Sequence, residues 1–518
     1  MNSSSVIIIG GGFAGLSAAT SLAAQGFQVT VLEGRQVLGG RAYSFKDPQT
    51  GDSVDNGQHL FMGCYRETQA FLKRINALDN LHFQTNLSVD FVGDHSRRAK
   101  LFCWPLPSPF HLLSGLMGLS TLSWADRFRL IYVQRALKRA LQNPQLVEHL
   151  TVEEWLKECR QSERARRHLW DLIAIATLNE SPSIAAAAPF VTVLAQAFFE
   201  RRQASRLGLA NVGLSDLYVQ AAQIFIKNHG GEIRHQSPVA ELDIRDHRVQ
   251  GVVLREGTHL SADWVISAVA PGAFLKMMPD ERRRNEPVFE RIARLTFAPI
   301  ISIHLWFDRE ISKSLFAGLL DTHIQWFFNK GKILKVPSPP PSPARGEGAS
   351  NKPPLPNVGE GWGEGVRRYY ISLVISGAHA FVEWSDKRLL TMVLEELRRL
   401  FPEAREASLL RSLIIKEHQA TLSPTVGSEA LRPDYQSPVQ NLLMAGDWTR
   451  TGLPATIESA CLSGHRCAEL IMKQTLKVTP SPLVGEGWDE GSVRAENVPL
   501  TPTLSHEGRG RSIKGIHA

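Results

Sequence analysis

The first 33 residues alternate between apolar runs and short polar or glycine-rich breaks. Residues 6–9 form a continuous β-branched run, which is typical of a strand buried on both faces of a parallel sheet. Apolar positions at helical spacing follow over 16–25 and stop at Gly26, and a second apolar run covers 28–32. The pattern predicts a strand, a helix and a second strand, the unit from which doubly wound α/β folds are built.

Glycines fill the turn between the first predicted strand and its helix. Gly10, Gly12 and Gly15 match G-x-G-x-x-G, and Glu33 lies 18 residues after Gly15, at the end of the second predicted strand. Such glycines allow a tight turn, a close backbone approach to a pyrophosphate and close packing of the helix on the strand, while the acid suits a free ribose 2′-hydroxyl. The sequence therefore predicts a dinucleotide site for FAD or NAD.

Later apolar runs are expected to return to the same sheet. The last run ends in Gly446-Asp447 and precedes a helix that is predicted to continue through Ile471. The apolar runs that predict these later strands are 229–239, 249–254, 262–271 and 442–445.

Two segments differ from the rest of the chain in composition. Residues 336–366 and 479–511 are rich in Pro, Gly, Ser and Glu, and they share a near-identical string, VGEGWGEG in the first and VGEGWDEG in the second. Such segments bury too little apolar surface to offset the entropy of ordering, so we expect both to be disordered. Apolar runs flank the first segment, which is therefore predicted to lengthen a hairpin loop.

Charge and cysteine content exclude several classes of protein. The chain has 58 Lys and Arg against 51 Asp and Glu, a net charge of +7 over 518 residues, which is too small an excess to predict a nucleic-acid partner. The five cysteines include no C-x-x-C pair, so we predict no metal site. The N-terminus has no basic region before its short apolar run, so we expect a cytoplasmic protein rather than a secreted one.

One long stretch carries no formal charge. Residues 101–125 are mainly apolar and contain Pro105, Pro107 and Pro109, which argue against a regular spanning helix. A basic stretch follows at Arg127, Arg129, Arg135, Lys138 and Arg139. Two interpretations remain open: a surface that dips into the membrane interface as a peripheral contact, or a cap that lines an apolar tunnel.

The residues just after Glu33 point to FAD rather than NAD. Gly39-Gly40-Arg41 resembles the second phosphate-contacting loop of FAD-containing amine oxidases and phytoene-desaturase-like enzymes. That resemblance implies that the two glycines approach the pyrophosphate and that Arg41 lies beside phosphate or flavin. It further implies that the Val239 backbone meets adenine, that Asp447 accepts hydrogen bonds on the ribityl or phosphate side, and that the helix after 455–457 (Ala455, Thr456, Ile457) aims its N-terminus at the flavin.

Four strings narrow the resemblance to hydroxysqualene dehydroxylases, FAD-dependent desaturase-like enzymes of hopanoid synthesis. These strings are DNGQHL at 55–60, WPLPSP at 104–109, VGLSDL at 212–217 and GLPATIE at 452–458. The resemblance covers 5–335 and 367–472, and it implies that reduced flavin, recharged by an external electron donor, converts the C30 alcohol hydroxysqualene to squalene and water. Gly57 and Gln58 would then contact the cofactor, while His59, with Asp55 as its partner, is a candidate proton donor or a structural neighbour of the flavin.

The same motifs leave other functions open. A carotenoid-type desaturase would use flavin in the oxidising direction on an isoprenoid, because flavin-binding motifs do not fix the direction of the reaction. An amine oxidase would need an aromatic cage, for which Trp448 is a candidate, and a non-catalytic scaffold would hold FAD structurally.

The predicted fold class is α/β, with a GxGxxG Rossmann-type FAD-binding domain, an inserted mixed-sheet substrate domain and a helical cap. The FAD-binding domain is expected in three parts, and the remainder is divided between cap, substrate sheet and tail. The predicted divisions are 1–80, 229–275 and 431–474 for FAD binding, 81–228 for the helical cap and substrate region, 276–430 for the substrate sheet with its insert, and 479–518 for the tail.

Overall fold

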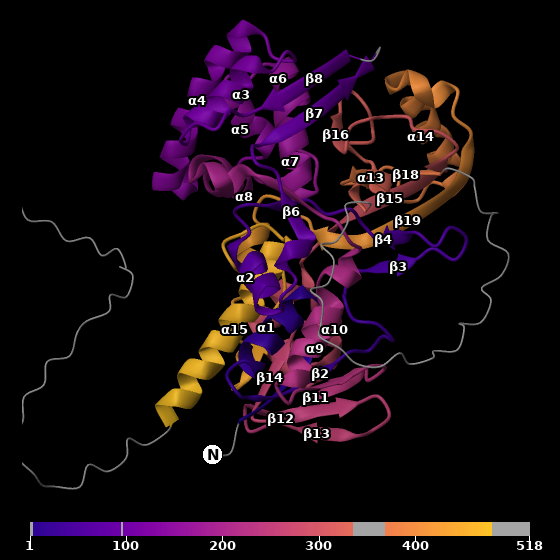
Figure 1. The fold of residues 1–518 in the computed structure, drawn as a ribbon. Coiled ribbons are helices and arrows are strands. Elements are labelled where there is room, and N and C mark those ends of the chain that lie inside the picture. Colours follow the sequence, from indigo (N-terminus) through magenta and orange to yellow (C-terminus); the bar gives the residue numbers. More distant parts are fainter. Residues whose placement is uncertain (1–3, 95–96, 335–367, 479–518) are drawn as a thin grey trace, which may run out of the picture. The chain divides into compact units, whose positions relative to one another are not determined.

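The computed structural model describes residues 4–94, 97–334 and 368–478 (Figure 1). The segments 336–366 and 479–518, for which the sequence predicts disorder, lie outside these described residues. The described residues up to Thr475 form one compact unit.

A five-stranded parallel sheet carries the predicted dinucleotide turn. Its order is β10-β2-β1-β14-β20, and each neighbouring pair is parallel. The strands are β1 (Ser5–Ile9), β2 (Gln28–Leu32), β10 (Glu232–Arg234), β14 (Trp264–Ser267) and β20 (Leu442–Met444). They come from three stretches that are far apart in the sequence, as the apolar runs predict, so the fold is confirmed as a GxGxxG-type α/β fold.

Three helices flank this sheet: α1 (Phe13–Ala23), α9 (Gln220–Asn228) and α15 (Ile457–Val478). Every residue of α1 is buried, because its residues are apolar or small on every side of the helix. Helix α15 packs against α1 through Gly464, where an added Cβ would lie 2.1 Å from the Ala14 carbonyl oxygen. The Ser17 hydroxyl donates to the Cys461 carbonyl at 3.0 Å and ties the same two helices together.

A small antiparallel sheet follows in the chain, formed by β11 (Val239–Arg245), β12 (Arg248–Leu254) and β13 (His259–Ser261). Two strand predictions need correction here. The run 229–239 gives only β10, because Gly230 and Gln236 have positive φ and interrupt the extended backbone, and Val239 opens β11 instead. The run 262–271 gives only β14, because Pro271 begins helix α10 (Pro271–Met277), where its fixed φ suits the first turn.

A seven-stranded mixed sheet forms the substrate region, in the order β19-β15-β18-β17-β16-β7-β8. Its strands are β7 (Ser88–Gly93), β8 (Arg97–Phe102), β15 (Phe297–Phe307), β16 (Phe316–Leu319), β17 (Trp326–Phe328), β18 (Tyr369–Ser376) and β19 (Leu409–Leu422). The predicted hairpin around 336–366 is confirmed, because β17 and β18 pair antiparallel with Trp326 opposite Val374.

Two apolar clusters lie on opposite faces of this sheet. On one face, Ile301, Ile303 and Leu305 of β15 pack with helix α14 (Asp386–Leu400). On the other face, Trp326, Phe328 and Val374 join the large apolar cluster of the helical cap. The alternation of β15 thus presents Ile300, Ser302, His304 and Trp306 to the cap side of the sheet.

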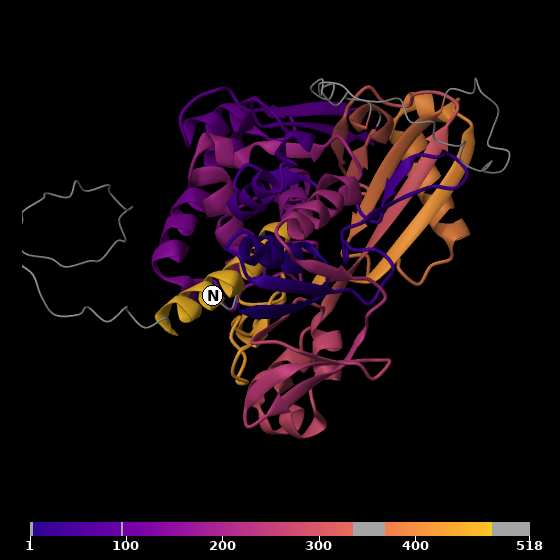
Figure 2. The same ribbon diagram turned by 60° about the horizontal axis from the view of Figure 1, so that its bottom comes forward.

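The cap lies beside the long strands of the sheet (Figure 2) and consists mainly of short helices. Within the predicted cap and substrate region, residues 88–93 and 97–102 form β7 and β8, whose alternating side chains fit strands. The helices are α3 (Phe110–Gly118), α4 (Trp124–Gln142), α5 (Val152–Glu158), α6 (Glu163–Ala165), α7 (Asp171–Leu178) and α8 (Ala187–Val193), with π-helical turns at Arg166–Trp170 and Leu194–Phe199.

Short elements connect these layers. Strands β3 (Ser44–Lys46) and β4 (Ser53–Asp55) form a hairpin, and β5 (Phe61–Met62), β9 (Leu207–Ala210) and β6 (Leu81–Phe83) form a small sheet. The remaining helices are α2 (Arg66–Arg74), α11 (Asp280–Asn285), α12 (Pro287–Ala293) and α13 (Lys330–Ile333). Over the residues described, each helix is too short or too polar to cross a bilayer.

The contact at Gly464 gives a stability prediction. We expect Gly464→Ala to lower the free energy of unfolding by about 1–3 kcal/mol, because the added methyl group forces α15 away from α1. Gly118→Ala is the matched control, since an added Cβ at the end of α3 meets nothing within 4 Å. Urea unfolding of both variants tests the prediction, and equal stabilities would contradict it.

Candidate functional site: a cofactor cradle beside a buried polar cluster

Two glycine turns face each other at the carboxyl edge of the parallel sheet. The Gly10 N–H donates to the Leu32 carbonyl at 2.8 Å, and the Gly39 N–H donates to the Gly11 carbonyl at 2.9 Å. A Cβ built on Gly12 would lie 3.8 Å from the Gly40 Cα, so only backbone lines this approach. Helix α1 begins at Phe13, next to the turn, and the first N–H groups of a helix have no intrahelical acceptors. The pair of turns therefore offers backbone donors to a pyrophosphate.

The conformations of these turns explain why glycine is needed there. Gly10 has a φ of 103°, and Gly39 and Gly40 have φ values of 120° and 61°, a region that L side chains rarely adopt. At Gly15 the constraint is space, since a Cβ would lie 1.9 Å from the Gly10 carbonyl oxygen. The local sequence thus fixes the cradle.

Glu33 occupies the place expected for the ribose acid. Its carboxylate accepts hydrogen bonds from the backbone N–H groups of Gly11 and Arg35, both at 3.0 Å. These contacts hold the side chain over the first glycine turn at the end of β2. A carboxylate has further lone pairs, so Glu33 can also accept from ribose hydroxyls.

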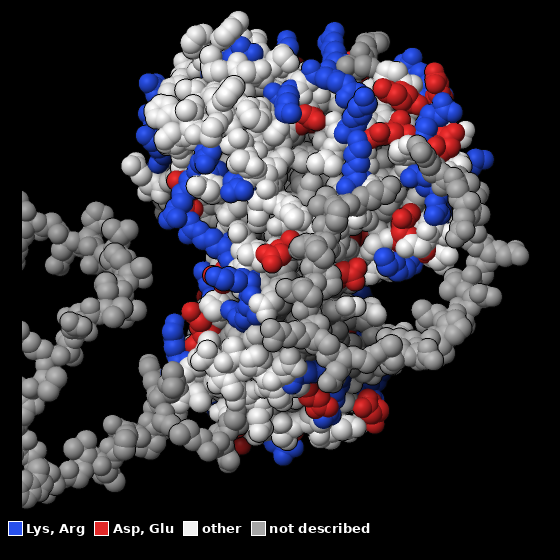
Figure 3. Space-filling view, viewed as in Figure 1, with Lys and Arg blue, Asp and Glu red and all other residues white. Residues whose placement is uncertain are grey.

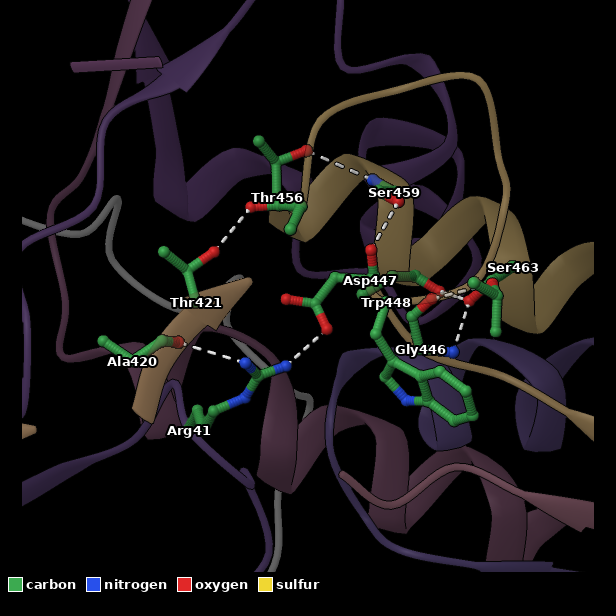
Figure 4. A network of polar contacts seen from close by, with 12 residues as sticks. Arg41, Ala420, Thr421, Gly446, Asp447, Trp448, Thr456, Ser459 and Ser463 are labelled. Atoms are coloured by element: carbon green, nitrogen blue, oxygen red, sulfur yellow. Dashed lines mark hydrogen bonds and ion pairs between the residues drawn. The ribbon is translucent and has the colours of Figure 1, made fainter. Parts of the chain in front are cut away.

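Arg41 and Asp447 form an ion pair across the site (Figure 4). Arg41 follows the second glycine turn, and its guanidinium also donates to the Ala420 carbonyl of β19 at 3.1 Å. Asp447 follows β20 and Gly446, whose φ is 149° and whose N–H donates to the Ser463 hydroxyl at 2.8 Å. The residues predicted for the phosphate and ribityl sides therefore lie together, although the sequence places them 406 residues apart.

Helix α15 begins beside this pair, as the resemblance implies. Its first residue is Ile457, and the preceding Ala455 carbonyl accepts a hydrogen bond from Thr421 of β19 at 3.1 Å. The Thr456 hydroxyl accepts from the Ser459 N–H at 3.3 Å, which satisfies one of the first donors of the helix (Figure 4). The positive end of α15 thus lies next to Asp447.

Val239 lies near the ribose acid, at the start of β11. The preceding residues run along the end of β2, where the Ser237 N–H donates to the Glu33 carbonyl at 2.9 Å and Gln236 donates to the Arg35 carbonyl at 3.0 Å. This places the Val239 backbone on the side of the cradle where the resemblance expects adenine.

Asp55 has partners other than the one expected. Its Oδ1 accepts from the Leu214 N–H at 3.0 Å, and its Oδ2 accepts from Lys330 Nζ at 2.7 Å. Both side chains of the Asp55–Lys330 pair are almost completely buried. The prediction that Asp55 orients His59 is therefore corrected: Asp55 anchors Lys330 and the turn at Leu214, and it acts on His59 only through its charge.

His59 lies next to this ion pair but is held by its own turn. Its Nδ1 donates to the Gly57 carbonyl at 2.8 Å; because a carbonyl only accepts, the neutral ring carries its proton on Nδ1 and leaves Nε2 as an acceptor. Burial, together with the Lys330 charge, lowers the pKa of His59 against the opposing effects of the Gly57 carbonyl and Asp55. The neighbouring Gln58 donates from Nε2 to the His59 carbonyl at 3.2 Å.

Buried polar side chains of the seven-stranded sheet continue this cluster. His304 of β15 lies opposite Ser372 of β18, and its Nδ1 is 2.8 Å from the Tyr370 hydroxyl. Burial lowers the pKa of His304 to about 4. Among the described residues, the buried Ser302 Oγ and Ser372 Oγ have no hydrogen-bond partner. Ser302 Oγ lies 3.8 Å from a Cβ built on Gly57, which brings the sheet beside the His59 turn.

Sequence reasoning missed two residues that hold the site together. The Tyr218 hydroxyl donates to the carbonyls of the second glycine turn, 2.8 Å from Gly39 and 2.9 Å from Ala42, and its ring stacks on Phe13 with centroids 3.8 Å apart. Tyr218 belongs to a π-helical turn at Ser215–Val219 and directly follows the quoted string at 212–217, which was the available signal. Lys330 had no such signal, since only the fold brings it to Asp55.

The aromatic cage considered for an amine is not formed by Trp448. This side chain is 1% exposed, donates from Nε1 to the Val269 carbonyl at 3.0 Å and packs beside Phe274. Trp448 is therefore a core residue below the site. The described residues also contain no group of His, Cys, Asp and Glu side chains that could hold a metal ion.

The fold and the cradle together define a dinucleotide-binding oxidoreductase. A glycine cradle that a side chain would fill, a carboxylate at the ribose position and a basic residue beside the phosphate position fit FAD. The chain belongs to the family of flavin-containing amine oxidoreductases, whose pattern it matches over residues 13–472. It is accordingly an FAD-dependent oxidoreductase of that family.

Similar proteins include desaturases of isoprenoids. The chain is 26% identical to a 15-cis-phytoene desaturase of an Oncidium hybrid over 93% of this chain and 80% of that one, and 26% identical to a 15-cis-phytoene desaturase of Synechococcus elongatus over 90% and 95%. Among solved structures, an oxidoreductase from Methanosarcina mazei superposes with a TM-score of 0.67 at 17% identity, covering 90% of this chain and 100% of that chain. The solved structure supports the fold.

Gly12 gives a test of the cradle. We expect Gly12→Ala to purify with much less FAD while the protein still folds, because the added methyl group meets protein atoms no closer than 3.8 Å and enters the space assigned to the pyrophosphate. The measurement is the ratio of flavin to protein absorbance, together with thermal melting of the cofactor-free protein. Gly272→Ala in α10 is the control, since its Cβ would meet nothing within 4 Å. If Gly12→Ala retained full FAD occupancy, the assignment of the pyrophosphate to this position would be wrong.

Proposed function

We propose that this enzyme catalyses the reductive dehydroxylation of hydroxysqualene to squalene, a step of hopanoid synthesis. In this reaction the allylic C–O bond breaks, the oxygen leaves as water, and bound reduced FAD would supply the hydride that replaces it. With it we propose a cytoplasmic enzyme that meets its C30 substrate at the inner face of the cell membrane and receives electrons from an external donor.

The observation that carries the proposal is the junction of two strings that resemble hydroxysqualene dehydroxylases. Asp55 in DNGQHL accepts the Leu214 N–H of VGLSDL. Beside it the Ser44 and Ser215 hydroxyls each accept from the other residue's backbone N–H, and the Ser215 hydroxyl donates to the Ser44 carbonyl, at 2.9–3.1 Å. The buried Lys330 and the His59 ring lie at the same junction. Residues of two of these strings thus meet at one polar site together with Lys330.

The chemistry of this polar site favours a substrate that carries oxygen. Burying a hydroxyl or imidazole nitrogen without a hydrogen-bond partner costs about 1–3 kcal/mol. Ser302 and Ser372 present such atoms on the cap side of the sheet, where Ser302 lies beside the Gly57–His59 turn. A pure hydrocarbon chain offers these atoms no partner, whereas an allylic alcohol does.

His59 is the residue we propose as proton donor to the leaving hydroxyl. Its Nδ1–H remains on the Gly57 carbonyl, so protonation occurs at Nε2, and the Asp55 charge nearby favours the resulting cation. The ring is neutral at neutral pH because its pKa is lowered, so only a minority of molecules carry the proton at any moment.

The second candidate function is isoprenoid desaturation, which the similarity to 15-cis-phytoene desaturases favours. The two reactions run in opposite redox directions, so one anaerobic experiment separates them. Enzyme with photoreduced FAD is mixed with hydroxysqualene, and flavin absorbance and extracted lipid are followed.

We expect one squalene for each flavin that is reoxidised, and no reoxidation with squalene itself, which has no hydroxyl to lose. Bleaching of oxidised flavin by 15-cis-phytoene, with no reaction of hydroxysqualene, would assign the enzyme to the desaturases. Absence of both reactions, with FAD fully bound, would support the scaffold alternative and overturn the proposal.

The role of His59 gives a pH prediction. Because its pKa lies below the ordinary value, the protonated fraction increases as pH falls, so kcat/KM should rise by up to about tenfold per pH unit from pH 8 towards pH 6. We expect His59→Gln to lower kcat/KM by about 100-fold at the acidic end and to remove this slope while retaining FAD. The pH profiles of both enzymes are the measurement, and the same slope in His59→Gln would assign the proton to another group.

A further inference from the structure

The cap exposes an unusual concentration of large apolar side chains. On α3, α4 and the loop before α3, seven of them are between 43% and 73% exposed to solvent. We refer to this set as the α3–α4 face: Trp104, Leu106, Phe110, Leu113, Trp124, Phe128 and Ile131. Exposed apolar side chains scattered singly need no explanation, but a contiguous group on consecutive helices marks an interaction surface.

The exposed side chains of helix α4 change from apolar to basic along its length. Its exposed positions Trp124, Phe128, Ile131, Arg135 and Lys138 follow one another at intervals of three and four residues, so they form a single stripe. The first half of the stripe is apolar and the second half is basic. The opposite side of the helix is buried in the cap through Val133, Leu137 and Ala140.

The charged side chains that α4 exposes to solvent are all basic. The helix carries five basic residues and one acid, Asp126, which is 3% exposed and accepts hydrogen bonds from Ser123 and Ser162. The Arg127 guanidinium lies 4.4 Å above the Trp124 ring. In Figure 3 the surface over α3, α4 and α5 is mainly white, with blue side chains at its edge.

We propose that the α3–α4 face docks on the surface of an anionic lipid bilayer, with its aromatic half in the interface and its basic half against lipid phosphates. Aromatic rings with a polar edge are stabilised at the depth of the headgroups, and Lys and Arg near them are attracted by anionic lipid. A protein partner would need acidic groups opposite the basic half of this face. Binding to a protein is therefore the alternative outcome of the test.

The interior of the cap connects this face with the polar site. One apolar cluster includes Leu112 of α3 and Val133 of α4, continues to Trp326 and Val374 of the sheet, and has Leu60 packed against it. Leu60 is the neighbour of His59. The apolar interior of the cap is therefore continuous from the α3–α4 face to the residue beside His59. That an isoprenoid substrate enters from this face rests on the proposed function, whereas the docking itself does not.

Vesicle binding tests the docking without any turnover. FAD-loaded enzyme is sedimented with phosphatidylcholine vesicles that contain or lack phosphatidylglycerol, and the bound fraction is measured at increasing lipid. We expect binding to the anionic vesicles, and Trp124→Ser/Phe128→Ser to weaken it at least about tenfold. Both side chains are largely exposed, so the variant should keep its FAD and its melting temperature.

Two further variants identify the cause of any loss. Arg135→Gln/Lys138→Gln should weaken binding to anionic vesicles at low salt and leave the weaker binding to neutral vesicles unchanged. Ile224→Ser, on α9 and 61% exposed, is the matched control and should bind as the parent enzyme does. Equal binding by all variants, or no binding by the parent enzyme, overturns the proposal. A concentration-dependent dimer that Trp124→Ser/Phe128→Ser abolishes, with no effect on vesicle binding, would assign the face to a second copy instead.

Discussion

The close approach of backbone to backbone at the start of α1 is the constraint on which the rest of this structure depends. Gly15 lets α1 rest on the turn at Gly10, and Gly464 lets α15 rest on α1, each at a distance that a Cβ would not allow. Because α15 begins at the cofactor site, its contact with α1 also sets where its N-terminus and the preceding Asp447 lie. One steric requirement therefore positions both ends of the FAD site, and the glycines serve packing and ligand binding together.

A second interaction joins the cofactor domain to the substrate sheet. The buried Asp55–Lys330 pair connects β4 with the residue that opens α13, just after β17, and the Leu214 N–H shares the same carboxylate. Removing one member of a buried ion pair leaves an unpaired charge in a low-dielectric interior, so such a pair constrains geometry more than it adds stability. Its position next to His59 means that the charge which anchors the domains also influences the titration of the proposed proton donor.

Whether a feature could be predicted from the sequence depends on how far apart along the chain the interacting residues lie. The strands at 5–9 and 28–32, the glycine turn and Glu33 form a local unit, and local periodicity was sufficient to place them. Arg41 and Asp447 could be assigned to one site only because each belongs to a string typical of FAD enzymes. Lys330 lies 275 residues from Asp55, and a single lysine before a Pro-rich segment gives no sign of burial. The sequence did not assign strands 88–93 and 97–102 to the substrate sheet, because they join it only through the non-local pairing of 88–93 with β16.

The distribution of polar atoms in the substrate region limits the chemistry that this site can perform. The cap supplies a large cluster of buried apolar side chains, which suits contact with a hydrocarbon. The buried imidazole of His304 and the hydroxyls of Ser302 and Ser372 carry a desolvation cost that such contact does not repay. Under the proposed function these groups gain a purpose, because a substrate hydroxyl could supply the hydrogen-bond partners that they lack. The polar cluster beside the apolar cap is therefore the feature on which the proposed removal of an oxygen, rather than desaturation of a chain, depends.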